Sequence, residues 1–233
     1  MRTDRLRRGQ PLAELASHID HALLDPFTTR EDVHRTCQQA RHFSFAGVCL
    51  FSRSIASARE WLPLEGPVRL ISVIGFPFGA VPTAITRAEA EAAAAYGADE
   101  LDVVPDFGAL AERDGNGLLE DLSAVTDLGL PVKVILEVGR LDAAALELLV
   151  EVCVDAGARY LKTGSGFGPP VTPEQVGRLR EELRHEWLDS ITQAAESGLS
   201  VVDRQIISLL GTEQLICLPM LNNGETIGCL VLG

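Results

Sequence analysis

Short apolar runs alternate with amphipathic segments along most of this chain, and this alternation is the feature that most restricts its fold. Six runs are rich in Val, Ile and Leu and have no polar face, as buried parallel strands do. They occupy residues 14–20, 46–51, 68–76, 99–104, 131–138 and 158–163. The segments between them have helical spacing, and three of these end in a glycine, the usual residue after a helix: Gly97, Gly129 and Gly157.

A repeated strand–helix unit of this kind predicts right-handed crossovers and a parallel sheet. A doubly wound sheet and a (β/α)8 barrel both fit, but no G-x-G-x-x-G follows the first run, which disfavours a dinucleotide-binding sheet. Five charged residues lie toward the ends of predicted strands, and such ends converge on one mouth in a barrel. These residues are Asp20, Asp102, Lys133, Glu137 and Lys162. We therefore predict an α/β fold of the TIM-barrel type.

The repeat stops near residue 184, after six units. Residues 185–211 have helical spacing, and strands are then expected at 215–219 and 227–232, around an Asn222-Asn223-Gly224 turn. We predict an N-terminal tail over residues 1–11 and an incomplete barrel over 12–184. A C-terminal helix and a β-hairpin are expected within 185–233.

Composition excludes several classes of partner. The net charge of −13 argues against a nucleic-acid surface. No apolar stretch approaches the roughly 20 residues that span a bilayer, so no membrane association is expected. The five cysteines include no C-x-x-C pair, and their odd number suits a reducing, cytoplasmic environment.

The chain contains only two lysines, Lys133 and Lys162, and both lie inside apolar runs where a permanent charge is costly. Burial and a neighbouring cation lower the pKa of a lysine, and a neutral amine can attack a carbonyl to form a Schiff base. Lys162 could be the nucleophile, Asp102 the proton carrier and Lys133 the neighbouring cation. The alternative is a buried Lys–Asp ion pair that only fixes the strand register.

Glycines follow Lys162 at positions 164, 166 and 168, and a predicted helix begins shortly afterwards. A glycine-rich loop that leads into a helix is a common anion site, most often for phosphate. Beside a Schiff-base lysine, this loop indicates a small phosphorylated sugar or aldehyde as the substrate.

Residues 12 to about 180 resemble the deoxyribose-phosphate aldolases, which are class I aldolases on a (β/α)8 barrel. The matching stretches are ASHIDHALLDP, AGVCLF, VIGFPFGA, AEAAAAYGADELDVV, KVILEVGRL and AGARYLKTGSGFGP. The resemblance implies reversible cleavage of 2-deoxy-D-ribose 5-phosphate to D-glyceraldehyde 3-phosphate and acetaldehyde. It implies no metal and no organic cofactor.

The resemblance also implies roles for individual residues. Lys162 matches the Schiff-base lysine and Asp102 the proton-relaying aspartate, while Asp20 and Lys133 match charged positions on strands one and five. The substrate is expected to contact residues on strand two and on the loop after strand six, namely Cys49, Thr163, Ser165 and Gly166.

Two departures from the family pattern bear on activity. The family's K-T-S-T-G motif is K-T-G-S-G here, and no lysine after Lys162 could match the second catalytic lysine of strand seven. The family's later phosphate-binding segments also lack a counterpart. We therefore expect impaired activity.

The last fifty residues resemble the middle of a GAF domain, a sensory ligand-binding module. The alternative function is a non-catalytic barrel relic or a sensory fusion protein. Exposed sheet edges and apolar faces would favour a homodimer.

Overall fold

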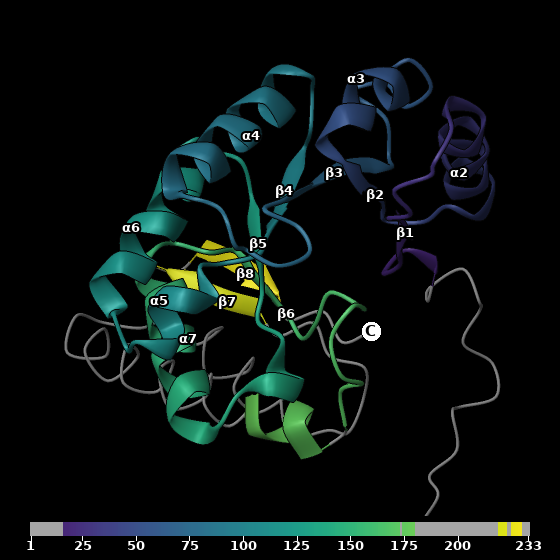
Figure 1. Ribbon diagram of the computed structural model, residues 1–233. Coiled ribbons are helices and arrows are strands. Elements are labelled where there is room, and N and C mark those ends of the chain that lie inside the picture. Colours follow the sequence, from purple (N-terminus) through teal and green to yellow (C-terminus); the bar gives the residue numbers. More distant parts are fainter. Residues whose placement is uncertain (1–15, 173, 180–218, 223–224, 230–233) are drawn as a thin grey trace, which may run out of the picture. The chain divides into compact units, whose positions relative to one another are not determined.

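The computed structural model describes residues 16–172, 174–179, 219–222 and 225–229. Six parallel strands follow one another in chain order in a single sheet (Figure 1). They are β1 (Asp20–Leu23), β2 (Gly47–Phe51), β3 (Arg69–Ile74), β4 (Glu100–Val103), β5 (Val132–Ile135) and β6 (Tyr160–Lys162). This order confirms the predicted α/β fold of the TIM-barrel type.

Helices connect the strands, as expected for parallel neighbours. They are α2 (Arg30–Phe43), α3 (Ser52–Arg59), α4 (Thr83–Ala95), α5 (Phe107–Ala111), α6 (Gly115–Thr126) and α7 (Ala143–Asp155), with the short 3₁₀ helix η1 (Val138–Arg140) after β5. In the part of the chain that the structure describes, none of them combines the length and apolar character needed to cross a bilayer.

The chain divides into two compact units. The first comprises residues 1–73 and 91–100, and the second comprises 74–90 and 101–233. In the first unit, β1 pairs with β2, and β2 pairs with β3, in parallel register. In the second unit, β4 pairs with β5, and β5 pairs with β6. All four residues of β4 and of β5 are buried. This explains why apolar and polar residues do not alternate in these two strands, as they would in a strand with one exposed face.

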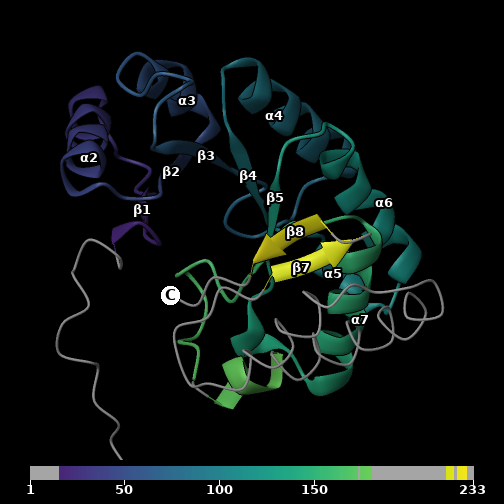
Figure 2. The ribbon, with the colours of Figure 1, turned by 180° about the vertical axis from the view of Figure 1, so that it is seen from behind.

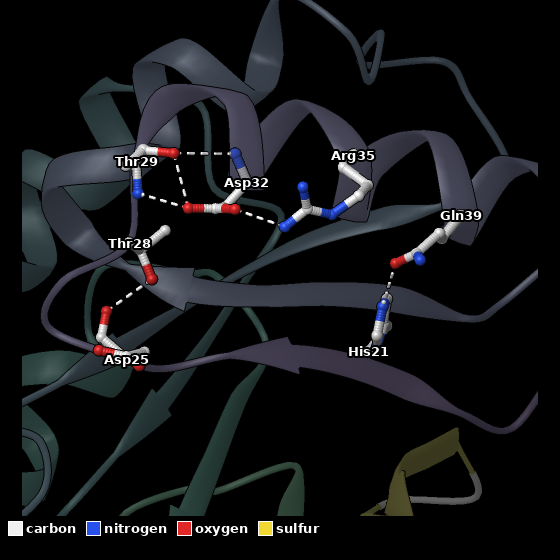
Figure 3. Close-up of polar contacts among 7 residues, drawn as sticks. All are labelled: His21, Asp25, Thr28, Thr29, Asp32, Arg35 and Gln39. Carbon is white, nitrogen blue, oxygen red and sulfur yellow. Dashed lines mark hydrogen bonds and ion pairs between the residues drawn. The ribbon is translucent and has the colours of Figure 1, made fainter.

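Helix α2 begins after the N-cap residue Thr29. The Asp32 amide donates to Thr29 Oγ1 at 3.2 Å, and the Thr29 amide donates to Asp32 Oδ2 at 3.0 Å (Figure 3). This reciprocal capping box satisfies two amides that the first helical turn leaves without partners. Asp32 also forms an ion pair with Arg35, one turn further along the helix.

The predicted glycine stops are confirmed in the second unit. Gly129 follows α6 with a φ of 80°, and Gly157 follows α7 with a φ of 75°. A left-handed backbone of this kind costs glycine little and ends a helix cleanly.

The first predicted strand was placed too early in the chain. Residues 14–20 were expected to be extended, but the Ile19 amide donates to Ala16 O at 3.1 Å and closes a turn there. Pairing starts only where Asp20 meets Gly47. Asp20 therefore lies at the beginning of β1, whereas it was expected near the end.

The fifth predicted strand was too long. β5 ends at Ile135, and the backbone at Glu137 has a φ of 53° and a ψ of 47°. This left-handed conformation is incompatible with a strand. The sequence concealed the turn because Leu136 and Val138, on either side of Glu137, are both apolar and buried, as they would be in a strand.

The predicted C-terminal hairpin is present as an antiparallel pair, β7 (Pro219–Asn222) and β8 (Glu225–Cys229) (Figure 2). The strands lie closer to the turn than the predicted 215–219 and 227–232. The two remaining turn positions, the helical segment at 185–211 and the N-terminal tail fall outside the described residues.

Candidate active site

Strands β4, β5 and β6 each contribute one charged side chain to the same region of the second unit. Asp102 is the register partner of Lys133, and Lys162 is the register partner of Ile135. Side chains alternate between the two faces of a strand, so Lys133 and Ile135 share a face. Lys162 therefore lies on the face that carries Asp102 and Lys133, one pleat closer to the carboxyl ends of the strands.

One carboxylate joins the two lysines. Lys133 Nζ donates to Asp102 Oδ1 at 3.1 Å, and Lys162 Nζ donates to Asp102 Oδ2 at 3.0 Å. The side chains of Asp102 and Lys133 are 1% and 3% exposed, whereas that of Lys162 is 26% exposed. The Lys162 side chain is therefore partly open to solvent, whereas the Lys133 side chain is buried.

The burial pattern separates the roles of the two lysines. A buried Lys133–Asp102 pair is enough to fix the register of β4 against β5, and the Tyr160 ring, 5.5 Å away, adds a cation–π contact to the Lys133 amine. Lys162 pairs with the other oxygen of the same carboxylate, and its side chain is more exposed than that of Lys133. The register-fixing alternative therefore applies to Lys133, while for Lys162 both interpretations stay predictions.

The glycine-rich segment after β6 folds back onto the end of β5. The Ser165 amide donates to Glu137 Oε1, and the Phe167 amide donates to Ser165 Oγ at 3.0 Å. Two amides of the predicted anion loop thus already have partners within the protein. Gly166, between them, has a φ of 85°, a conformation that favours glycine.

A helix begins beyond this loop, as the sequence predicted. The Thr172 amide donates to Gln175 Oε1 at 2.9 Å, and the Gln175 amide donates to Thr172 Oγ1 at 3.3 Å. This second capping box confirms the predicted order of loop and helix start. Thr163, at the beginning of the loop, is buried, and its carbonyl accepts a hydrogen bond from the Val138 amide at 2.9 Å.

A cavity of about 480 Å³ lies in the second unit, among the loops that follow β3 to β6. Its walls are mostly apolar and include Phe78, Phe107, Leu110, Arg113, Arg140 and Phe167. Neither Lys162 nor Asp102 lines it, so the cavity does not by itself identify the reactive centre. Among the residues that the structure describes, the lysine cluster places a partly exposed lysine beside a buried carboxylate, and it is therefore the candidate reactive centre.

Two further predicted site residues belong to the first unit. A Cβ added at Gly47 would lie 2.8 Å from Asp20 Oδ1, so the Asp20 carboxylate lies close against the backbone of the neighbouring strand. Cys49 is buried at the centre of β2. The roles that the resemblance implies for Asp20 and Cys49 remain predictions.

Sequence reasoning gave no role to two buried acids of the second unit. Glu137 was noted only as a polar residue near a strand end, yet its carboxylate anchors the loop after β6. Asp121, in α6, accepts a hydrogen bond from the Asp106 amide at 3.2 Å, and burial raises the pKa of its carboxyl. Its apolar neighbours Leu118, Leu122 and Val125 were the available signal, since they place position 121 on the buried face of the helix.

Several sequence relatives of this chain are described as deoxyribose-phosphate aldolases. A deoxyribose-phosphate aldolase from Thermosynechococcus vestitus is 38% identical over 174 residues, covering 74% of this chain and 80% of that protein. One from Crocosphaera subtropica is 31% identical over 223 residues, covering 91% and 96% respectively. The second alignment extends into the C-terminal quarter of this chain. No family model matches the chain.

A solved structure supports the same relationship. The deoxyribose phosphate aldolase from Aeropyrum pernix, described as a tetramer, superimposes with a TM-score of 0.64 at 34% identity. The match covers 72% of each chain. The similarity therefore includes both sequence and fold over the region that contains the lysine cluster.

Proposed function

Because this chain belongs to the deoxyribose-phosphate aldolase family, we propose that it cleaves 2-deoxy-D-ribose 5-phosphate through a Schiff base on Lys162. A class I aldolase needs an amine that can lose its proton and be reached by an aldehyde. Lys162 meets the second requirement better than Lys133, since its side chain is 26% exposed and that of Lys133 is 3% exposed. This difference in access is the observation that carries the proposal.

Asp102 and Lys133 suit the proton transfers that the reaction needs. Asp102 lies 3.0 Å from Lys162 Nζ, within reach of a proton on that nitrogen. Lys133 occupies the other carboxylate oxygen, so the negative charge is shared between two cations. The Lys162 amine therefore shares its counter-charge with Lys133.

The bond changes then follow from iminium chemistry. The Lys162 amine adds to the C1 aldehyde, and loss of water gives the iminium. Removal of the proton from the C3 hydroxyl breaks the C2–C3 bond, releases glyceraldehyde 3-phosphate and leaves an enamine on Lys162. Protonation of the enamine carbon and hydrolysis then release acetaldehyde. Asp102 is the proposed carrier of these protons.

The loop after β6 is the proposed substrate-contact segment. Thr163, Ser165 and Gly166 follow Lys162 directly, and a helix begins beyond them. The Ser165 hydroxyl retains a proton to donate, although its amide is engaged with Glu137. Cys49 and Asp20 complete the set that the resemblance implies.

Borohydride trapping tests the proposal directly. Reduction in the presence of acetaldehyde should fix a stable adduct, and mass mapping should locate it on the peptide that contains Lys162. An adduct confined to Lys133 would overturn the assignment. No adduct at either lysine would favour a non-catalytic barrel, the alternative suggested by the lack of any lysine after Lys162.

Location and assembly are further parts of the proposal. Cys37, Cys49 and Cys153 are buried and lie outside any disulfide, and on this basis we propose a cytoplasmic location. A homodimer is proposed on the exposed apolar side chains of the second unit, including Phe78 and Ile85. The GAF-like character of the last fifty residues stays a prediction that none of the relatives supports.

A further inference from the structure

Glu137 occupies an unusual position two residues beyond the end of β5. Its backbone is left-handed, with a φ of 53°, which is uncommon for a residue that has a Cβ. Its side chain is only 6% exposed. Burial and a left-handed backbone both carry a free-energy cost for a glutamate. We therefore examine which contacts of Glu137 offset this cost.

The Glu137 carboxylate is enclosed by the loop after β6. Oε1 accepts the Ser165 amide, and Oε2 lies 3.8 Å from Arg140 Nε. A Cβ added at Gly168 would come within 1.7 Å of Oε2, so the loop passes directly against the carboxylate. The carboxylate therefore fills the space beneath the loop, where a larger residue at position 168 would displace it.

Backbone hydrogen bonds on either side of Glu137 hold the same loop at its beginning. The Leu136 amide donates to Lys162 O at 2.8 Å, and the Val138 amide donates to Thr163 O at 2.9 Å. Together with the Glu137 side chain, these contacts fix the backbone from Lys162 to Ser165 against residues 136–138. Lys162 is the last residue of β6, so its backbone direction depends on how this junction is held.

We propose that Glu137 is a positioning residue for the reaction, which holds the loop after β6 so that the Lys162 amine stays in line with Asp102. The inference rests on the proposed function. It assigns no contact between Glu137 and the substrate. In this arrangement the Ser165 amide is not available to a substrate phosphate, because it already donates its hydrogen bond to the Glu137 carboxylate.

Two variants of similar size separate this role from general packing. Glu137→Gln keeps an acceptor oxygen for the Ser165 amide, whereas Glu137→Leu removes it; both must adopt the same left-handed backbone. We expect Glu137→Gln to form the trapped Lys162 adduct within about 3-fold of the unaltered rate. Glu137→Leu should be slower by on the order of 10²-fold, the effect of a displacement of about 1 Å in a reacting group.

Asp99 provides a matched control. Its carboxylate also accepts a backbone amide, that of Leu70 at 2.7 Å, and pairs with an arginine, Arg59 at 2.7 Å. Asp99→Leu should therefore cost stability of the same kind without changing the trapping rate per folded molecule. The folded fraction of each variant is measured by urea unfolding, and hydrogen exchange of the peptide covering 163–168 reports the loop separately.

The outcomes distinguish the inference from the proposed function. Faster exchange at 163–168 and slower trapping in folded Glu137→Leu would support it, with a lower kcat at a nearly unchanged KM. Trapping by Glu137→Leu at the unaltered rate, or a loss equal to that of Asp99→Leu, would overturn the inference alone. Absence of an adduct in the unaltered protein would overturn the proposed function, and the positioning role with it.

Discussion

Lys133 and Lys162 donate to opposite oxygens of one buried carboxylate, and only Lys162 is open to solvent. The three groups depend on one another, because removing the shared anion leaves a sealed ammonium without its counter-charge. The cluster therefore contributes to stability as well as to the proposed chemistry, and the two contributions can be measured separately.

We expect Asp102→Asn to lower the free energy of unfolding by about 3 kcal/mol, since it breaks a buried ion pair by removing one partner. The double variant Asp102→Leu with Lys133→Met should recover most of this loss, because it replaces the pair by apolar groups. Urea unfolding measures the stability, and the trapped adduct measures the chemistry. Recovery of adduct formation together with stability would contradict the role given to Asp102.

Aldolase turnover should be weak. Losing a positioned acid or base typically costs about 10²–10⁴-fold in rate, and no lysine after Lys162 supplies the family's second catalytic amine. A coupled cleavage assay on 2-deoxyribose 5-phosphate, with Lys162→Ala as the control, measures this. Turnover on the order of 10 per second, typical of enzymes, would show that another group replaces the missing lysine.

Asp32 should make the first unit less stable in acid. Hydrogen bonds from Thr29, followed by the contact with Arg35, lower the pKa of Asp32 to about 2 (Figure 3). Its pKa in the folded chain lies below that in the unfolded chain, so its contribution is complete above about pH 4 and is lost as the pH falls toward 2. Unfolding monitored from pH 6 to 2 should show a shallower decline for Asp32→Asn. The exposed neighbour Glu31 provides the control, and an equal effect of Glu31→Gln would refute the assignment.

Asp121 should have the opposite pH dependence. Burial raises the pKa of its carboxyl, so its contribution to stability is complete below the pKa of the unfolded chain, near 4, and falls as the pH rises through the folded value. Asp121→Asn keeps an acceptor for the Asp106 amide and has no charge to bury. We expect this variant to gain stability over the unaltered protein between pH 4 and pH 8. A constant difference across that range would disprove the explanation.

The order of strands and helices could be predicted from the alternation of apolar and amphipathic segments. The lysine cluster could be predicted because parallel strands bring residues at corresponding positions along neighbouring strands close together. Asp102, Lys133 and Lys162 each sit inside a strand whose apolar letters locate it to within a few residues. Asp20 was misplaced because apolar Ala16 and Ile19 lie in a turn that the run of letters does not reveal. The role of Glu137 was missed for a similar reason. Its left-handed backbone and the hydrogen bond that it accepts from the Ser165 amide depend on tertiary contacts, which the sequence does not show.

The unequal access to the two lysines also has a practical consequence for handling the protein. Reagents that attach proteins to resins, dyes or surfaces usually acylate lysine side chains, and the eighteen arginines of this chain do not react with them. Of the two lysines, Lys133 is enclosed and Lys162 is accessible. Among side chains, conventional amine coupling would therefore converge on Lys162, the position that the proposed reaction requires. Immobilisation for catalysis would need a different anchor.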